Sequence, residues 1–364
     1  MKVVTILGTR PEIIKLSPLL PLLDAEFDQV VIHTNQHYDY EMDGTFFKDL
    51  QLPQVKYNLN VGSHQQGKQV GLMLEKIENI LKEEKPDVVI VQGDTNTTLA
   101  GALAAAKVYI PLVHVEAGCR SFNKKMPEEI NRIVADRCAD YFFAADQGSV
   151  DNLAQEGITK NVFLVGNTIF DAVVRNKKLA EKSTILGELG ITEGNYVLAT
   201  IHRQQSTTEK KVLENIMTAL GILAEKMPVV FPLHPGTKKA LEKHHIKPNQ
   251  RIKIIKSQEY LPFLKLLAHC RFCITDSGGI QDEALVFNVP ALIPRYETEW
   301  MRLVNAGKNF LVGNTTESIL IKAQQLVNDD RELQRIKAIK CPYETGAAEK
   351  IVQIMKEKIR KELP

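Results

Sequence analysis

Short apolar runs rich in β-branched residues alternate with longer amphipathic stretches along the whole chain. Most of the runs are continuously apolar, which is typical of parallel strands covered on both faces. The stretch 67–84 instead places Val70, Met73 and Ile77 on one stripe, which predicts a helix. Such alternation predicts right-handed β-α-β units and doubly wound sheets. Strands are expected at 3–7, 30–34, 87–92, 112–115, 141–144 and 162–165, and then at 196–201, 229–233, 252–255, 272–275, 291–294 and 310–312.

The alternation pauses once, at residues 176–194, which are polar and charged. We place a hinge just before this stretch, after Gly166, Asn167 and Thr168. The 364 residues exceed what one hydrophobic core usually serves, so two domains are expected, at 1–168 and 169–345. The remaining segment, 346–364, predicts a charged amphipathic helix.

Composition and charge narrow the possible partners. Hydrophobic residues make up 44% and charged residues 25%, which suits a large core and a wetted surface. The 46 Lys and Arg against 44 Asp and Glu leave a net charge of +2, so we expect no nucleic acid and no membrane partner. The longest apolar stretch, at 100–115, is interrupted by Lys107 and Pro111 and is not a membrane span.

The five cysteines are scattered and odd in number, which argues for a reducing compartment, so we expect a cytoplasmic protein. No signal-peptide pattern follows Met1. Cys270 and Cys273 form a C-x-x-C pair, but Cys273 lies in an apolar run and is interpreted as a core residue. No second cysteine pair or histidine pair has the spacing of metal ligands, so no metal site is expected.

Ligands of open α/β sheets bind beyond the carboxyl ends of the strands, so the residues that follow each strand are the candidates. In the first half, Asp94 and Glu116 each follow a strand, and Glu128 opens a helix that contains Arg132. Three carboxylates at one sheet edge suit general acid–base chemistry and would push each other's pKa values apart. Each alone is as compatible with a helix cap or a surface carboxylate.

Cations also stand at a helix start in the first half. Arg10 lies within the Gly-Thr-Arg-Pro-Glu turn that follows the first strand, and Lys15 lies just beyond it. A helix N-terminus with cations nearby suits an anion. The alternative for both is a solvated surface position, and for Lys15 the sequence does not decide between the two.

The second half shows a phosphate-binding pattern. His202 and His234 each follow a strand, and the turn Ser277-Gly278-Gly279 opens a helix after another. Such a turn aims bare backbone N–H groups at a phosphate, and Glu283, one turn inside, can accept hydrogen bonds from ribose hydroxyls. Neither a G-x-x-x-x-G-K nor a G-x-G-x-x-G motif is present, which disfavours ATP hydrolysis and nicotinamide binding. The two halves together suggest a diphosphate-linked sugar held in the cleft between the domains.

These motifs resemble, nearly end to end, the non-hydrolysing UDP-N-acetylglucosamine 2-epimerases. The matching runs are GTRPE, GDTNTTLAGALAA, HVEAG, PEEINR, GNT with Asp171, His202-Arg203, DSGGIQDE and Pro342-Tyr343. The resemblance implies two facing Rossmann-like domains of glycosyltransferase-B type, with the active site in the cleft and the last helix returning to the first domain. It implies a homodimer that uses a UDP-sugar and no cofactor, and products that feed surface polysaccharide or protein glycans.

The resemblance also implies the reaction and the residues that perform it. UDP is eliminated to leave a 2-acetamidoglucal and is then added back with C2 inverted. Asp94, Glu116 and Glu128 form the acid–base group, with the base at C2 left open, while Arg10, Lys15 and His202 stabilise the departing diphosphate. The resemblance implies nine substrate-binding residues, among them those that contact the phosphate and the ribose. They are Arg10, Lys15, Arg132, His234, Ser277, Gly278, Gly279, Glu283 and Arg295.

Some positions depart from the family pattern and keep alternatives open. Gln205 stands where many members carry a carboxylate, and Trp300 where many carry an arginine. The Trp300 region and Ser121-Phe122-Asn123 are more similar to relatives that act on UDP-2,3-diacetamido-2,3-dideoxyglucuronate. The main prediction is interconversion of UDP-N-acetylglucosamine and UDP-N-acetylmannosamine. The alternatives are the diacetamido substrate, a glycosyltransferase of the same fold, and a catalytically silent nucleotide-sugar-binding protein.

Overall fold

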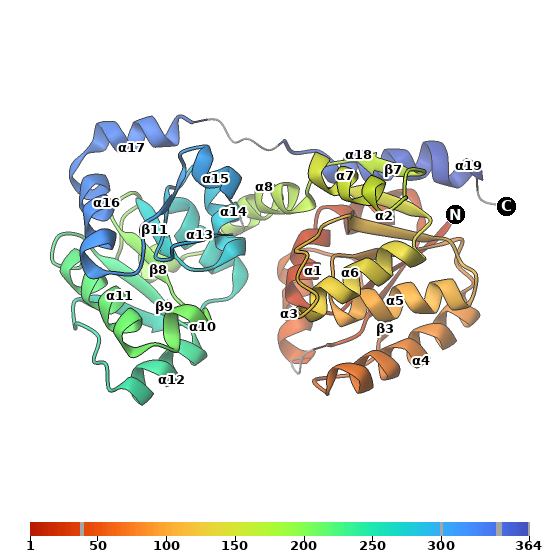
Figure 1. The fold of residues 1–364 in the computed structure, drawn as a ribbon, viewed down its shortest axis with the longest axis horizontal. Helices are drawn as coiled ribbons and strands as arrows, with labels where there is room; N and C mark the ends of the chain where they lie inside the picture. Colours follow the sequence, from red (N-terminus) through yellow and green to blue (C-terminus); the bar gives the residue numbers. More distant parts are fainter. Residues whose placement is uncertain (37–39, 299–300, 340–343, 363–364) are drawn as a thin grey trace. The chain divides into compact units, whose positions relative to one another are not determined.

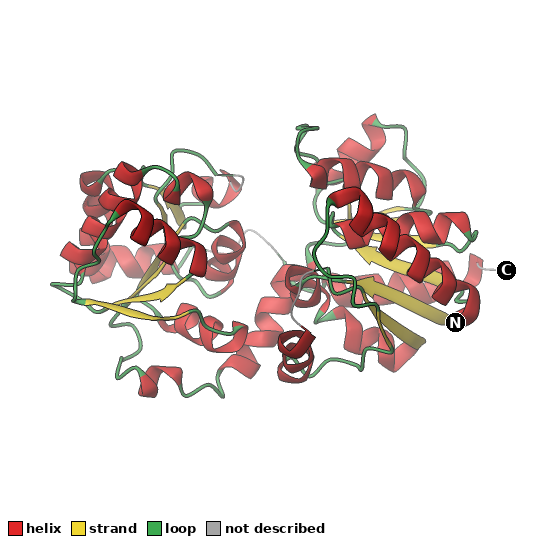
Figure 2. Ribbon diagram, turned by 90° about the horizontal axis from the view of Figure 1, so that it is seen from below, coloured by secondary structure: helices red, strands yellow, loops and turns green. Residues whose placement is uncertain are grey.

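The computed structural model describes residues 1–36, 40–298, 301–339 and 344–362, which form two compact units. The first consists of Met1–Ala172 with Glu344–Pro364, and the second of Val173–Tyr343. In each unit helices cover both faces of a parallel sheet (Figures 1 and 2), which confirms the predicted two-domain Rossmann-like class. The division between the units falls inside α8 (Thr168–Ala180); the sequence-based limits at 168 and 345 stay predictions.

The first sheet has the order β3-β2-β1-β4-β5-β6-β7, and all its pairs are parallel. The chain moves outward from β1 in one direction and then from β4 in the other, so the topological switch point lies between β1 and β4. The strands are β1 (Lys2–Leu7), β2 (Asp28–His33), β3 (Tyr57–Asn58), β4 (Val88–Gln92), β5 (Leu112–Ala117), β6 (Tyr141–Ala144) and β7 (Val162–Leu164).

The second sheet repeats this plan in the order β10-β9-β8-β11-β12-β13, with its switch point between β8 and β11. Its strands are β8 (Val197–Thr200), β9 (Val229–Leu233), β10 (Ile252–Lys256), β11 (Phe272–Thr275), β12 (Ala291–Ile293) and β13 (Asn309–Leu311). Every one of the predicted strands is therefore present, and the short β3 is an additional strand that the sequence pattern did not predict.

The helices of the first unit are α1 (Arg10–Leu16), α2 (Leu19–Glu26), α3 (Tyr40–Asp49), α4 (Gln66–Glu84), α5 (Asn96–Lys107), α6 (Pro127–Cys138), α7 (Gln147–Gln155), α18 (Ala347–Ile354), the π-helix η1 (Met355–Ile359) and α19 (Arg360–Glu362). Those of the second unit are α9 (Ile185–Glu188), α10 (Gln204–Thr207), α11 (Lys210–Leu223), α12 (Pro235–His244), α13 (Tyr260–His269), α14 (Gly278–Val286), α15 (Met301–Asn305), α16 (Thr316–Asn328) and α17 (Asp330–Lys337).

Each unit has its own hydrophobic core, because the central strands are apolar on both faces. In the first unit Ile6 and Val91 pack with Met73 and Ile77 of α4, and all four are fully buried. Burial of one such side chain contributes about 1.5–3 kcal/mol, so the strand ends that follow are held on a rigid frame.

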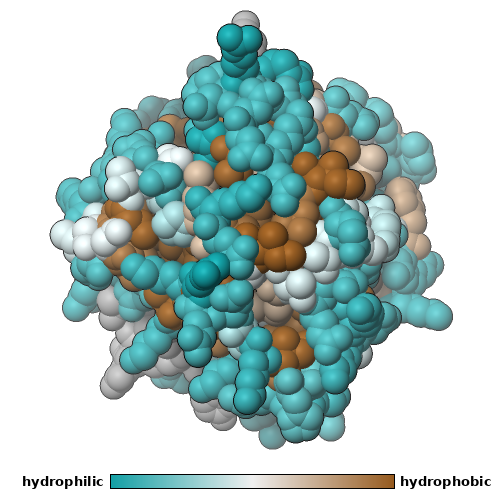
Figure 3. All heavy atoms as spheres, turned by 90° about the vertical axis from the view of Figure 1, so that its left-hand side faces the viewer, coloured by the Kyte–Doolittle hydropathy of each residue, from teal (hydrophilic) through white to brown (hydrophobic). Residues whose placement is uncertain are grey.

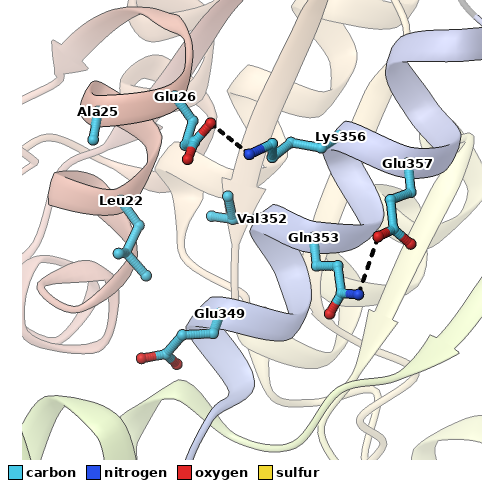
Figure 4. Close-up of a pocket in the computed structure, with 8 residues that line it drawn as sticks. All are labelled: Leu22, Ala25, Glu26, Glu349, Val352, Gln353, Lys356 and Glu357. Atoms are coloured by element: carbon cyan, nitrogen blue, oxygen red, sulfur yellow. Dashed lines mark hydrogen bonds and ion pairs between the residues drawn. The ribbon is translucent and has the colours of Figure 1, made fainter.

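The C-terminal segment packs on the first unit. Asp171 accepts hydrogen bonds from the backbone N–H groups of Gly346 (2.6 Å) and Ala348 (2.8 Å), and so caps the start of α18. Further along, Lys356 pairs with Glu26 of α2 at 2.7 Å, beside a shallow pocket between the two helices (Figure 4). The GNT motif with Asp171 thus has a structural role in anchoring the end of the chain.

The surface is chiefly hydrophilic where Figure 3 shows it, with small apolar patches between the charged side chains. Within the described parts of the chain, no helix combines the length and the apolar character that a membrane crossing requires.

Candidate active site

Charged side chains from the ends of β4 and β5 and from α1 and α6 gather near the switch point of the first sheet. Asp94 follows β4, and Glu116 lies in β5 at a register shift between Val115 and Ala117. Glu116 has a positive φ of 66°, a conformation that costs a non-glycine residue energy and that active sites retain. The irregular backbone directs Glu116 differently from a residue in a regular strand.

Glu116 is held through one of its two carboxylate oxygens. Lys15, on α1, pairs with Oε2 at 2.7 Å, whereas Oε1 is buried and has no hydrogen-bond partner within the described residues. The turn after β4 lies beside this carboxylate, because a Cβ built on Gly93 would be 3.7 Å from Oε2 of Glu116. Within the described residues, one oxygen of this carboxylate is therefore hydrogen-bonded and the other is not.

Arg132 on α6 holds the carboxylate of Asp94 in place. Its guanidinium forms an ion pair with Asp94 and another with Glu129 at 2.9 Å. The side chain of Asn131 donates to the backbone carbonyl of Asp94 at 2.9 Å. Asp94 is one-third exposed, so it is fixed in position and still accessible.

The two adjacent glutamates at the start of α6 differ in exposure. Glu128, which the sequence analysis chose, is exposed, whereas Glu129 is buried. Burial favours a raised pKa for Glu129, but hydrogen bonds from Ser121 and Phe122 and the charge of Arg132 outweigh it and lower the pKa. Glu129 therefore orients Arg132 and the loop after β5.

Glu12 is a buried carboxyl of this region that sequence reasoning did not select. It accepts hydrogen bonds from the Gly8 N–H (3.0 Å), the Thr9 hydroxyl (2.8 Å) and the Thr95 hydroxyl (2.8 Å), and so joins the turns after β1 and β4. Complete burial raises its pKa to about 7. Arg10, next to this turn, is exposed with its guanidinium 5.8 Å from the Phe46 ring.

The switch point of the second sheet is built differently. Asp276, fully buried after β11, accepts the backbone N–H groups of His202 and Arg203, each at 3.0 Å, and so fixes the loop after β8. The His202 ring lies 5.6 Å from the His234 ring. Burial lowers the pKa of His202, with His234 adding to the effect and Asp276 opposing it.

The helix α14 presents its N-terminus beside this loop. Ser277 is the N-cap without a side-chain cap hydrogen bond, and a Cβ added to Gly279 would meet nothing within 4 Å. Glu283, one turn inside, is buried, and burial raises its pKa to about 8. A helix start of this kind suits an anion, because its first-turn N–H groups and the helix dipole carry partial positive charge. Gly278 lies in the same first turn, and Arg295 is buried beyond the end of β12.

The structure thus gathers the predicted site residues into two groups. The first unit places Lys15, Asp94, Glu116 and Arg132 at one switch point; the second places His202, His234 and the Ser277-Gly278-Gly279 turn at the other. Trp300, Pro342 and Tyr343 lie outside the described residues. No group of three or more His, Cys, Asp or Glu side chains with a metal-binding arrangement occurs in the described ranges.

Fold and site together define a two-domain α/β protein with polar and charged groups gathered at the switch point of each sheet. The family model described as UDP-N-acetylglucosamine 2-epimerase matches residues 23–356. The chain therefore belongs to the UDP-N-acetylglucosamine 2-epimerase family, and it is an epimerase, that is, an isomerase.

Individual relatives are consistent with membership of this family. The UDP-N-acetylglucosamine 2-epimerase of Methanocaldococcus jannaschii is 44% identical over 98% of this chain and 99% of its own. A crystal structure of that organism's UDP-GlcNAc 2-epimerase in complex with UDP-GlcNAc and UDP matches with a TM-score of 0.82, over 98% of this chain and 99% of that one, at 44% identity. The UDP-2,3-diacetamido-2,3-dideoxy-D-glucuronate 2-epimerase of Pseudomonas aeruginosa is 37% identical over 92% of this chain and 95% of its own.

Proposed function

We propose that this protein interconverts UDP-N-acetylglucosamine and UDP-N-acetylmannosamine by inverting C2 of the sugar. The higher identity to UDP-N-acetylglucosamine 2-epimerases than to the diacetamido enzyme supports this substrate. The observation that carries the proposal is the Glu116 carboxylate, which Lys15 holds through one oxygen while the other has no partner among the described residues, at the same sheet edge as Asp94.

In the proposed reaction a carboxylate removes the C2 proton while the bond between C1 and the diphosphate oxygen breaks. The products of this half-reaction are UDP and a 2-acetamidoglucal. UDP then adds back to C1, and C2 takes a proton on the opposite face, so atoms and electrons balance without an oxidant or a reductant. Asp94, Glu116 and Glu128 form the acid–base group. The ion-paired positions of Asp94 and Glu116 and the exposed carboxylate of Glu128 support these roles.

The diphosphate is held by cations and by backbone donors in this proposal. Arg10, Lys15 and His202 offset the negative charge that grows on the leaving group. The first-turn N–H groups of α14 bind a phosphate, and Glu283 binds the ribose. The open N-terminus of α14 and the buried position of Glu283 support these assignments.

The experiment is incubation of the pure protein with UDP-N-acetylglucosamine in D2O, without an acceptor, followed by proton NMR. Appearance of UDP-N-acetylmannosamine with deuterium at C2 is the expected result. Transfer or hydrolysis of the sugar, or a C2 proton that survives turnover, would contradict the proposal.

A second substrate has a specific observation in its favour. The identity of 37% to the Pseudomonas aeruginosa enzyme accompanies the Ser121-Phe122-Asn123 stretch that is similar to diacetamido-uronate enzymes. The same D2O experiment with UDP-2,3-diacetamido-2,3-dideoxyglucuronate decides between them, because the preferred substrate is exchanged faster at equal concentration.

We also propose a cytoplasmic homodimer whose product feeds polysaccharide or glycan synthesis. The free thiols of Cys119, Cys138, Cys270 and Cys273 support a reducing compartment. Light scattering of the purified chain tests the dimer, which predicts twice the 40.9 kDa of one chain.

A further inference from the structure

His114 bridges three elements beneath the candidate acid–base group. It lies in β5, two residues before Glu116, and its ring is fully buried. Its Nδ1 is 2.7 Å from Asp136 Oδ1 on α6, and its Nε2 is 2.8 Å from the backbone carbonyl oxygen of Gly93, the residue before Asp94. One ring therefore contacts the end of β4, the end of β5 and the helix that carries Arg132.

Both partners of this ring accept hydrogen bonds. The Gly93 carbonyl can only accept. The other oxygen of Asp136 receives the N–H of Gly118 at 3.1 Å and the guanidinium of Arg120 at 2.7 Å, which keeps this carboxylate ionised. Both ring nitrogens must then carry a hydrogen, because a neutral ring would set a lone pair against one of two buried acceptors.

The surrounding charges favour the same state. Burial alone would lower the pKa of His114, but Asp136, Gly93 and Glu116 outweigh it and raise the pKa. Asp136 faces the ring from α6, and Glu116 lies on its own strand. Arg120 pairs with Asp136 and, at 2.7 Å, with Glu156 at the end of α7; Lys15 of α1 faces Glu116.

Another buried histidine of the same sheet provides the contrast. His33, at the end of β2, uses Nδ1 to accept the backbone N–H of Asn35 at 3.1 Å, which only an unprotonated nitrogen can do. Burial lowers its pKa to about 4. These two histidines of one sheet are both almost fully buried, yet their pKa values shift in opposite directions because their partners differ.

We propose that His114 is a buried imidazolium and a positioning residue, whose two N–H bonds hold the Gly93-Asp94 turn against the irregular backbone at Glu116. Gly93 is also tied to β5 by its own N–H, which donates to the Val115 carbonyl at 3.0 Å. The charged ring completes a clamp across both strand ends, so Asp94 and Glu116 keep a fixed separation. The inference rests on the proposed function only where it takes these two carboxylates as the acid–base group.

The charge state is tested by NMR of the wild-type protein labelled with 15N-histidine, over about pH 6 to about pH 9. The expected spectrum shows two protonated ring nitrogens for His114 and a single neutral tautomer for His33, assigned with the His114→Gln and His33→Gln variants. A His114 ring that is neutral at neutral pH overturns the proposal. This measurement needs no turnover, so it stands even if the substrate assignment fails.

The positioning role is tested with His114→Gln, whose side-chain amide donates from only one end. We expect turnover to fall about 100-fold with UDP affinity unchanged, since a displacement of about 1 Å at reacting groups has that effect. His33→Gln is the matched control for loss of a buried histidine and should keep wild-type turnover. The backbone amide signals of Asp94 and Glu116 should shift in His114→Gln, which is read without any substrate.

The outcomes separate the two claims. If the wild type acts on neither UDP-sugar, the proposed function is refuted. If the amide signals nevertheless shift in His114→Gln, the proposed clamp is still supported. Unmoved amide signals, or wild-type turnover in His114→Gln, would overturn the clamp. If His114→Gln does not fold, Asp136→Asn, which keeps the shape and removes the charge, is measured in the same way, with the same result expected and the same results overturning the clamp.

Discussion

The two switch points share a topology and differ in what they present. In the first unit the groups are charged side chains, with Lys15 on Glu116 and Arg132 on Asp94. In the second unit the carboxylate of Asp276 accepts hydrogen bonds from backbone N–H groups. The other groups at this switch point are the N-terminus of α14 and the imidazole rings of His202 and His234. Side-chain carboxylates can exchange protons, whereas backbone donors can only bind a charge. Under the proposed function, the first unit therefore supplies the acid–base carboxylates, and the second supplies the backbone donors of α14 for the phosphate.

Near its switch point, each unit also has a buried carboxyl whose pKa is raised by burial. Glu12 and Glu283 both have pKa values raised by burial, to about 7 and about 8. Their surroundings differ, because Glu12 accepts hydrogen bonds from Gly8, Thr9, Thr95 and Thr98, whereas Glu283 is hydrogen-bonded to Tyr260. Glu12 joins the turns after β1 and β4, whereas for Glu283 a contact with the ribose is proposed.

Replacement of Glu116 by Gln should have the largest effect on turnover. The amide cannot take a proton, so we expect a loss of about 1,000-fold in kcat, with UDP affinity within about twofold of wild type. Steady-state assays and UDP titration calorimetry check both values. Glu78→Gln, which removes the carboxylate of an exposed ion pair with Lys82, is the control and should leave both unchanged. A Glu116→Gln enzyme with substantial turnover would remove Glu116 from the chemistry.

Replacement of Glu283 by Ala should act on binding instead. Loss of a buried hydrogen-bonding group to the ribose is expected to weaken UDP binding by about 1–3 kcal/mol. Glu283→Gln keeps an acceptor oxygen and should weaken it less. Unchanged UDP affinity in Glu283→Ala, measured by calorimetry, would refute the ribose assignment.

Replacement of Gly279 by Ala separates binding from stability in one variant. The added Cβ meets no protein atom, and alanine favours the helix, so the free energy of unfolding should rise by about 0.4–1 kcal/mol. The same Cβ would crowd a phosphate at the first turn, so UDP affinity should drop about tenfold. Gly71→Ala in α4, where the space is equally open, should give the stability gain alone. Equal UDP affinity in the two variants would argue against the α14 phosphate site.

The smallest effect is expected in the pH dependence of UDP binding. Since burial lowers the pKa of His202 below 6.5, its ring is neutral at about pH 7.5 before ligand binds. A diphosphate favours the imidazolium and raises that pKa, so binding takes up protons and strengthens as pH falls from about 8 to about 6. His202→Asn removes this contribution, and the difference between the two proteins, measured by calorimetry in two buffers, cancels the titration of UDP itself. Identical pH profiles would mean that His202 does not face the diphosphate.

The fold was accessible to sequence reasoning because parallel strands buried on both faces leave long apolar runs. β9 (Val229–Leu233) and β11 (Phe272–Thr275) coincide with their predicted ranges. β3 (Tyr57–Asn58) was missed because two half-buried residues carry no periodic signal.

The partners within the site were less accessible. Residue spacing placed Asp94 and Glu116 at one sheet edge, but the pairing of Lys15 with Glu116 joins positions far apart in sequence and depends on the path of α1. The sequence pattern did not show that Glu128 is exposed and Glu129 buried, since only the helix orientation decides which of two adjacent glutamates turns inward. His114 offered one signal, a histidine within an otherwise apolar strand.

The division of labour between the two units is tested most directly with Asp94→Asn, incubated with UDP-N-acetylglucosamine in D2O beside the wild type. The account predicts that the wild type places deuterium at C2 of both UDP-sugars, whereas the variant binds UDP with unchanged affinity and leaves the C2 proton in place. Deuterium at C2 at the wild-type rate, or loss of UDP binding together with loss of exchange, would contradict the account.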